Sequence, residues 1–286
     1  ARKAVTELEE AGAQIRVLQA DVSQKEQVAK MLAEMAQTMP PLCGVIHAAG
    51  VLDDGVLRQQ DRARFVNVMG PKVNGATALH ELTRGLPLDF FVLFSSASSL
   101  LGSPGQGNYA AANAFMDALA HERRARGLPA LSVNWGAWGE VGMAAALGGR
   151  DQRRLAEQGL GQILPEQGVQ VLEQVLQLGA AQVGVLPINW TRLAQQFPAG
   201  SVPPLFSEVI SQMQAGKGGS SPDKQAEFKR VLEATPADQR QELLTGYVRD
   251  QVVKVLGLPS PEALDLSQPL TDVGLDSLMA IELKNR

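Results

Sequence analysis

Up to residue 197, apolar residues occur in two alternating patterns along the 286-residue chain. The opening segment, ARKAVTELEEAGAQ, has them at helical spacing and reaches a stop glycine at Gly12. Later helical stretches alternate with short runs rich in Val, Ile, Leu and Phe, which lie at 14–23, 42–50, 89–96, 129–138 and 182–190. Such runs are typical of a parallel sheet covered on both faces. We therefore predict an α/β fold with a doubly wound parallel sheet.

The predicted helices determine where these strands end. We expect Ser23 to cap a helix that runs through Met39, a helical stretch through Lys72 and Leu82, and a helix that opens at Tyr109. Right-handed crossovers bring the carboxyl ends of parallel strands to one edge of the sheet, where ligands bind in open sheets. The residues expected at that edge are Ala20-Asp21, His47 to Gly50, Ser95-Ser96 and Trp135-Gly136.

The composition changes after Phe197. Residues 198–237 are rich in Gly, Ser and Pro, with one short apolar island, and we predict a linker there. Residues 238–286 then predict an all-α segment, with one amphipathic helix, a turn-rich stretch and a helix that begins at Leu275 or Asp276. Because both chain ends fall inside predicted helices, we expect a fragment: a sheet domain over 1–197, incomplete at its N-terminus, and a helical domain that is incomplete at its C-terminus.

The composition also limits the classes of function. A formal net charge of −4 without a basic block argues against a nucleic-acid binder. The single cysteine, Cys43, excludes an internal disulfide and a thiolate-rich metal site, and we expect no metal. The sequence shows no signal peptide and no apolar stretch long enough to cross a bilayer. We therefore expect a cytoplasmic protein that binds neither nucleic acid nor membrane.

Three side chains with complementary chemistry lie close together in the sequence. Ser96 closes an apolar run, Tyr109 opens a helical segment after a Gly- and Pro-rich loop, and Asn113 lies one turn later on the same face. A phenol, with a pKa of about 10, keeps its proton at neutral pH and can give it to an oxygen that is becoming an alkoxide. A nearby hydroxyl can donate a second hydrogen bond to that oxygen.

We therefore assign Tyr109 as the candidate acid and Ser96 as its helper. Lys72, in PKVNGATALH, is the candidate ammonium that would lower the tyrosine pKa, and Asn113 is a candidate for holding backbone or water in a proton path. Each residue taken singly has an ordinary alternative, because Ser and Tyr in such loops often serve a turn and helix-borne lysines are usually solvated.

As a set, these residues resemble the ketoreductase domains of modular polyketide synthases, a branch of the short-chain dehydrogenase/reductase superfamily. The matching segments are PKVNGA with Lys72, FSSASS with Ser96, NYAAANAFMDALA with Tyr109, and NWGAWGEVGMA after the next strand. In that branch the lysine precedes the serine and an asparagine follows the tyrosine by four, whereas ordinary members have Tyr-x-x-x-Lys. The resemblance covers residues 1–197 and implies a Rossmann-like fold.

The resemblance also implies the reaction and its cofactor. Family members use NADPH to reduce a β-ketoacyl thioester that an acyl carrier protein holds, beside other synthase domains such as a ketosynthase and an acyltransferase. Asp21 and Val22 would hold the adenine end, and the HAAG turn would pass under the ribose and nicotinamide, where small residues let the backbone come close. A tight strand–helix turn explains HAAG equally. The cofactor contacts implied in all are Asp21, Val22, Ala48, Ala49, Gly50, Lys72, Tyr109 and Gly136.

One departure concerns the phosphates of the cofactor. The G-x-G-x-x-G turn that should follow the first strand of such a fold is missing, and the chain starts in what resembles the helix after the second strand. We expect this polypeptide alone to bind NADPH poorly, so the activity is assigned to a longer parent protein.

The loop after HAAG carries the residues that the family links to stereochemistry. Leu52-Asp53-Asp54 matches the pattern of the D-configured, B-type outcome, and no tryptophan lies between Ser96 and Tyr109, where the opposite type carries one. Ala111 stands where several epimerising members have proline. The resemblance thus implies a non-epimerising B-type reductase, and the alternative is that the two aspartates cap the next helix. Residues 139–161 are either a lid over the substrate or a surface insertion.

The second motif, GLDSLMAIELKNR, resembles the modification site of acyl carrier proteins. Ser277 would open a helix, where free N–H groups favour an anion, and would accept a 4′-phosphopantetheine arm from coenzyme A inside a phosphopantetheinyl transferase. The alternative is an ordinary N-capping Asp-Ser pair. Two rival functions also remain, a free-standing short-chain dehydrogenase and a carrier or scaffold module whose reductase half is inactive.

Overall fold

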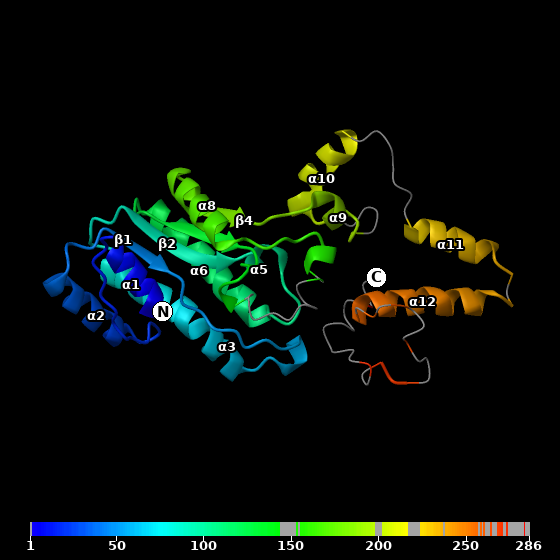
Figure 1. Ribbon diagram of the computed structural model, residues 1–286, viewed down its shortest axis with the longest axis horizontal. Helices are drawn as coiled ribbons and strands as arrows, with labels where there is room; N and C mark the ends of the chain where they lie inside the picture. Colours follow the sequence, from blue (N-terminus) through cyan, green and yellow to red (C-terminus); the bar gives the residue numbers. More distant parts are fainter. Residues whose placement is uncertain are drawn as a thin grey trace. The chain divides into compact units, whose positions relative to one another are not determined.

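The structure is a computed structural model, shown as a ribbon in Figure 1. It describes residues 2–143, 153, 155–197, 202–216, 224–236, 238–256, 258, 260, 264, 268–270, 273 and 283. The chain divides into two compact units, which are described separately. Unit 1 comprises Ala1–Asn134 and Gln174–Gly184, and unit 2 comprises Trp135–Glu173 and Val185–Arg286.

Unit 1 is built around a four-stranded parallel sheet with the order β1-β2-β3-β4. Its elements are α1 (Arg2–Glu10), α2 (Lys25–Thr38), β1 (Gly44–His47), η1 (Leu57–Gln59), α3 (Arg62–Met69), η2 (Gly70–Asn74), α4 (Gly75–Thr83), β2 (Phe90–Ser96), α5 (Ser98–Leu101), α6 (Gly107–Ala125), β3 (Leu131–Trp135) and β4 (Gln182–Val185). β1 pairs with β2 in parallel, from Gly44 opposite Phe90 to His47 opposite Leu93. The strands that the sequence predicts within 42–50, 89–96, 129–138 and 182–190 are thereby confirmed.

The apolar core of unit 1 lies between the sheet and the helices α2, α4 and α6. Alternate residues of β2, Phe91 and Leu93, face Met116 and Ala120 of α6, which packs against that strand (Figure 1). This follows from the two-residue period of a strand, because every second side chain points to the same face. The core holds α6 against the sheet, so the first turn of α6 lies near the carboxyl ends of the strands.

The predicted first strand, at 14–23, is wrong. Residues 13–21 form no strand, and the side chain of Val17 is 76% exposed. A strand needs a neighbour to pair its N–H and C=O groups, and among the described residues none pairs with this segment. Ser23 does not cap α2 either. The N-cap is Gln24, while the Ser23 amide and hydroxyl donate to Asp21 Oδ1 at 2.9 and 2.7 Å.

Unit 2 contains mostly helices in its described part. They are α8 (Pro165–Gln177), whose residues from Gln174 on are assigned to unit 1, α9 (Trp190–Ala194), α10 (Pro204–Gly216), α11 (Lys224–Ala234) and α12 (Arg240–Leu256). Phe206 of α10 packs edge-on against Trp190 at a ring distance of 5.8 Å. The segment predicted as a linker therefore contains two helices, of which α10 packs on α9.

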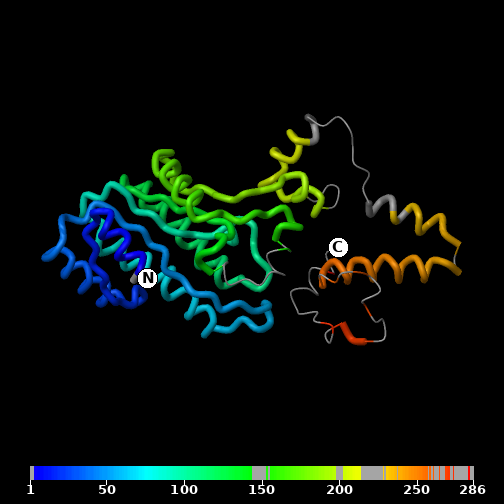
Figure 2. Tube along the Cα trace, in the orientation of Figure 1, coloured from blue at the N-terminus to red at the C-terminus, as the bar shows by residue number. Residues whose placement is uncertain are grey.

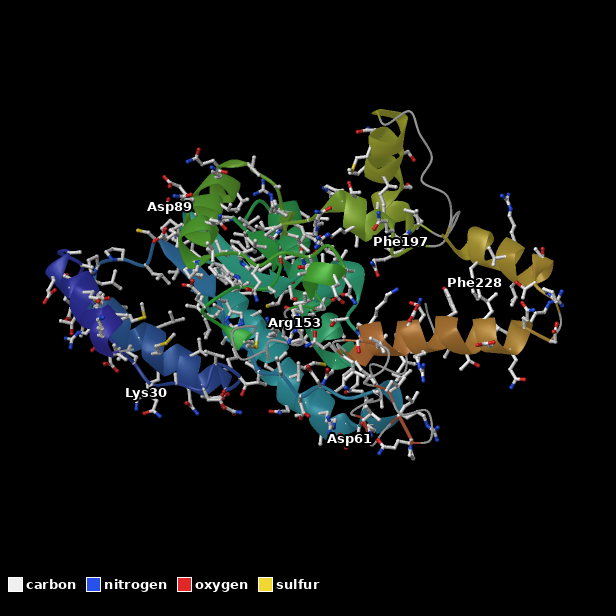
Figure 3. The ribbon with its side chains drawn as sticks, turned by 45° about the vertical axis from the view of Figure 1, so that its right-hand side comes forward. Lys30, Asp61, Asp89, Arg153, Phe197 and Phe228 are labelled. Carbon is white, nitrogen blue, oxygen red and sulfur yellow. The ribbon has the colours of Figure 1, made fainter. Side chains whose placement is uncertain are left out.

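The helices α11 and α12 run antiparallel to each other, as the gold and orange parts of Figure 2 show. Phe228, labelled in Figure 3, stacks on Tyr247 at a ring distance of 4.0 Å. After this contact, α12 buries an apolar cluster that comprises Val252, Val253, Val255, Leu256 and Leu264. The amphipathic helix predicted in this region is confirmed.

Among the described residues, no helix combines the length and the apolar character that crossing a membrane requires.

Candidate active site

Lys72 lies on one π-helical turn, η2, between α3 and α4. Pro71 in this turn has no N–H to donate. The Gly75 N–H donates to Gly70 O, five residues earlier, which is the hydrogen bond of a π-helical turn. The turn directs Lys72 inward, where its side chain is 2% exposed and its Nζ donates to Phe94 O at 3.1 Å. The alternative of a solvated lysine is therefore wrong.

The buried ammonium of Lys72 lies beside the phenol ring of Tyr109, with 5.2 Å between Nζ and the ring centroid. Burial lowers the pKa of Lys72 to about 8, and the charge of Asp117 acts in the opposite direction. Lys72 thus titrates much closer to neutral pH than an exposed lysine does. It can gain and lose a proton within the working range of an enzyme.

Two residues of the HAAG segment, His47 and Gly50, pack around this lysine and the turn that carries it. A Cβ atom at Gly50 would come within 2.9 Å of Lys72 Cε, so only glycine allows this approach without displacing the lysine. His47 Nε2 lies 3.0 Å from Pro71 O. Burial and the charge of Lys72 lower the pKa of His47 to about 4, so the ring is neutral at physiological pH and its Nε2–H donates to that carbonyl.

Tyr109 and Asn113 lie one turn apart on the buried face of α6, as the sequence predicts. Burial raises the pKa of Tyr109, the side chains of Asn113 and Ser96 lower it, and the charge of Asp54 raises it further. The phenol is therefore protonated at neutral pH, which is the form that an acid needs. The structure brings Ser96, at the end of β2, close enough to Tyr109 to act on its titration.

Asn113 is completely buried, and its Nδ2 donates to Tyr109 O at 2.8 Å. Among the described residues, no donor reaches Asn113 Oδ1. A buried amide oxygen usually has a partner, because leaving it without one costs about 1–3 kcal/mol. This oxygen is therefore an acceptor beside the tyrosine that is available to a donor.

The Leu52-Asp53-Asp54 loop is fastened to the segment that precedes Tyr109. Asn108 Nδ2 donates to Asp53 O at 2.8 Å, and Gln106 Nε2 donates to Asp54 Oδ2 at 2.9 Å. Gly55 N–H also donates to Gly105 O at 2.8 Å. These contacts hold the loop next to the start of α6.

The alternative role of the two aspartates, as helix caps, is wrong. The N-cap of α3 is Asp61, which accepts from Arg64 N, and the N-cap of η1 is Val56. The Asp53 carboxylate instead pairs with Arg64 Nη1 at 3.0 Å. Asp61 is labelled in Figure 3, at the start of α3.

The remaining residues implied in cofactor binding lie at three places in the chain. Asp21 is exposed and turned toward Ser23, whose side-chain and backbone hydrogen bonds lower the pKa of Asp21, and Val22 lies near the Gly75 backbone. Ala48 is exposed, and Ala49 is half-buried. Gly136 belongs to unit 2, where its N–H donates to Val185 O at 2.8 Å.

The residues of unit 1 fit the nicotinamide end of a dinucleotide. Gly50 leaves room for the buried Lys72, and the Asn113 Oδ1 without a donor lies on the same helix face as the Tyr109 phenol. They do not supply the phosphate end, because β1 is the first strand among the described residues and no glycine-rich turn precedes it.

Two residues of the site escaped the sequence analysis. Asn108 is completely buried, and its Oδ1 accepts from Tyr109 N at 2.8 Å. Asp117 is 7% exposed and accepts hydrogen bonds from Ser99 and Ser132. For Asp117 the sequence did contain a signal, because this residue lies four positions after Asn113 and so continues the buried face of α6.

Two predicted features lie outside the described residues. They are Ser277 and the central part of the predicted lid, residues 144–152 and 154.

The chain matches two protein-family models. Residues 1–140 match the family described as KR domain, and residues 246–286 match the family described as phosphopantetheine attachment site. Domains of the first family bind NADPH, and those of the second carry 4′-phosphopantetheine.

Much longer curated proteins are similar to the whole chain. The phenolphthiocerol synthesis polyketide synthase type I Pks15/1 of Mycobacterium marinum is 42% identical over 290 residues, which cover 100% of this chain and 14% of that protein. Polyketide synthase GfsB of Streptomyces halstedii is 40% identical over 290 residues, covering 99% of this chain and 5% of its own length. The chain therefore spans a small part of these relatives.

Solved structures are similar to the reductase part in fold and sequence. A structure of A-type ketoreductases from a modular polyketide synthase has a TM-score of 0.68 and 39% identity, covering 73% of this chain and 44% of that one. The first ketoreductase of the tylosin polyketide synthase has a TM-score of 0.59 and 41% identity, covering 66% of this chain and 40% of that one. The Rossmann-like fold expected from the sequence is thereby confirmed.

Proposed function

Since this chain belongs to the polyketide synthases, with a ketoreductase domain over residues 1–140 and a phosphopantetheine attachment domain over residues 246–286, we propose that the longer parent synthase uses this part to reduce the β-ketone of a carrier-bound acyl thioester. The product is the β-hydroxyacyl thioester. The observation that carries this proposal is the convergence of Lys72, Ser96, Tyr109 and Asn113 at one end of the sheet.

Each of these side chains has one task in the reaction. Ser96 donates a hydrogen bond to the ketone oxygen and holds it toward Tyr109. Tyr109 gives its phenolic proton to that oxygen as negative charge develops there. The Lys72 ammonium stabilises the phenolate that results, and Asn113 supports the path by which a proton returns to it.

NADPH, when bound, supplies the hydride that the β-carbon of the substrate accepts. Gly50, with Ala48 and Ala49, would lie against its nicotinamide and ribose, and Asp21 and Val22 would hold its adenine end. The phosphates would be held by residues of the parent protein, because the described residues contain no turn for them.

We assign the hydroxyl product to the D-configured, B-type class. The anchored position of Leu52-Asp53-Asp54 supports this, because hydrogen bonds from Gln106 and Asn108 hold that loop beside the first turn of α6. The similar A-type structure does not argue against it, since 39% identity describes the whole domain and the type depends on a few residues near Tyr109.

The second domain carries the substrate on the arm that Ser277 accepts. A phosphopantetheinyl transferase would attach this arm by attack of the serine hydroxyl on the pyrophosphate of coenzyme A, with release of adenosine 3′,5′-bisphosphate. A ketosynthase and an acyltransferase of the same synthase would supply the β-ketoacyl group.

The test of the reductase uses the extended protein, in which this chain is joined to the residues that precede and follow it in the synthase. NADPH oxidation is followed with a β-ketoacyl thioester. Tyr109→Phe should lower turnover by about 10²–10⁴-fold, the usual contribution of a positioned acid. Tyr247→Phe is the matched control, because it changes the other tyrosine of the chain and keeps the ring that stacks on Phe228. Equal turnover in both variants would refute the role of Tyr109.

The configuration of the product, read by chiral chromatography, tests the stereochemical assignment. An L-configured alcohol from the unchanged protein would overturn it.

Mass spectrometry after incubation with coenzyme A and a phosphopantetheinyl transferase tests the carrier. The mass of the arm should appear in the unchanged protein and in the control Ser260→Ala, and it should be absent in Ser277→Ala.

A further inference from the structure

A buried carboxylate with a complete set of donors lies behind the proposed active site. Asp117 Oδ2 accepts from Ser99 Oγ at 2.7 Å, and Oδ1 accepts from Ser132 Oγ at 2.6 Å. Asn134 Nδ2 lies 3.0 and 2.9 Å from the two oxygens. These donors come from α5 and β3, so Asp117 on α6 joins three separate elements.

The orientation of the Asn134 amide is determined by a further partner. Gln182 Nε2 donates to Asn134 Oδ1 at 3.0 Å, so the NH₂ group of Asn134 faces Asp117. Ser132 and Asn134 are completely buried, and Asp117 is 7% exposed. Burial of a carboxylate is costly unless charge-assisted hydrogen bonds compensate for it, and here they do. The cluster is therefore part of the buried structure and not an incidental contact at the surface.

The same cluster supports the residues that carry the chemistry. Asn134 Nδ2, which faces Asp117, lies 3.4 Å from Ser96 O. Asn134 Nδ2 also lies 3.0 Å from Ser95 Oγ, and that hydroxyl lies 3.3 Å from Asn113 O. The strand end that bears Ser96 and the helix that bears Asn113 are thus joined through the donors of one carboxylate.

The carboxylate also acts on Lys72 through its charge. Burial lowers the pKa of Lys72, and the charge of Asp117 is what opposes that effect. The other titratable groups that face Lys72 are His47 from β1 and Tyr109 from α6. The pKa of His47 is about 4 and that of Tyr109 is raised, so both are neutral around pH 7. His121 is on the far side of the cluster, with its Nε2 3.1 Å from Gln182 Oε1.

We propose that Asp117 is a positioning residue for the reduction, because its hydrogen bonds to Ser99, Ser132 and Asn134 hold the strand end that carries Ser96 against α6, the helix that carries Tyr109 and Asn113. Its charge also favours the ammonium form of Lys72 beside Tyr109. This inference rests on the proposed reduction and adds to it a residue that touches neither substrate nor cofactor.

The test is the pH dependence of kcat/KM in the extended protein. For the unchanged protein, activity should fall as the pH rises through the pKa of Lys72, about 8. In Asp117→Asn, the alkaline limb should move to lower pH by roughly one unit, because the charge that favours the ammonium is gone. Glu122→Gln removes one charge from the exposed face of the same helix and should leave the limb in place.

A merely structural role would lower the rate without moving the limb, so a folded Asp117→Asn protein with an unshifted limb overturns the proposal. The double variant Asp117→Asn, Asn134→Asp returns a carboxylate to the cluster and should restore the limb. If Asp117→Asn does not fold, the double variant decides alone, and a shifted limb in it overturns the proposal. Absence of turnover in the unchanged protein would instead contradict the proposed function.

Discussion

Unit 1 buries a lysine, two histidines and three asparagines beside its apolar core, whereas the described core of the carrier domain, residues 246–286, consists of valines and leucines. Burial of polar groups costs free energy unless each finds a partner, so a protein retains them where they serve chemistry. In unit 1, Lys72, Asn108 and Asn113 contact Tyr109. The carrier core supports a proposed serine that reacts inside another enzyme, and apolar packing is sufficient for that.

This difference in core composition indicates that the two parts have different structural requirements. The reductase must hold several groups in fixed geometry and fixed charge, which requires buried hydrogen bonds. The carrier must only fold and present its arm. Variants that change apolar volume should therefore affect either part, while pH and close backbone contacts should affect unit 1 alone.

The largest expected effect on stability comes from truncating one large core side chain of unit 1. Phe91 is completely buried in β2, and the Arg123 guanidinium lies 3.8 Å from its ring centroid. Phe91→Ala should lower the free energy of unfolding by about 3–5 kcal/mol. Hydrogen exchange read by mass spectrometry should show faster exchange in β1, β2 and α6 and unchanged exchange in α12. Leu256→Ala, as the matched variant, should reverse this distribution, and loss of protection in both parts from either change would show that they fold as one unit.

Acidification should lower the free energy of unfolding of unit 1 by about 3 kcal/mol and leave that of the carrier domain unchanged. The folded state holds His47 with a pKa of about 4, against an ordinary value of 6.5, so the unfolded chain binds the extra proton between these values. This contribution is fully present above pH 6.5 and is lost as the pH falls toward 4, with a size of about 3 kcal/mol for a shift of this extent.

The protection of η2 and β1 against hydrogen exchange should decrease through that window. His47→Gln keeps a donor for Pro71 O and cannot titrate there, so this part of the pH dependence should vanish. A slope that persists in the variant would assign the effect to another group.

The smallest expected changes in stability come from replacing two glycines, one in each part, by alanine. Gly50→Ala places a methyl group against Lys72 and should destabilise unit 1 by about 1–3 kcal/mol, the usual result of overpacking. A Cβ atom at Gly246, on α12, meets no atom within 4 Å. Gly246→Ala should therefore stabilise α12 by about 0.5–1 kcal/mol through helix propensity. Region-resolved exchange measures both, and equal signs would remove the contrast.

The sequence predicts those parts of the fold that depend on local patterns. Apolar runs located all four strands of the sheet, and helical spacing placed Tyr109 and Asn113 on one face of α6. It failed for residues 14–23, because an apolar run becomes a strand only where a partner strand pairs with it. The cap of α2 failed for a similar reason, since Ser23 found a closer acceptor in Asp21.

By itself, the amino-acid sequence determined the order of strands and helices, the family and the residues that carry the proposed chemistry, because spacing and residue type are local properties of a chain. Only the tertiary structure decided that Lys72 is buried against Phe94 O, that Asn108 ties the Leu52-Asp53-Asp54 loop to α6, and that Asp117 lies behind the site. Hydrogen bonds and charge effects between residues far apart in sequence exist only after the chain has folded, so no pattern along the chain contains them.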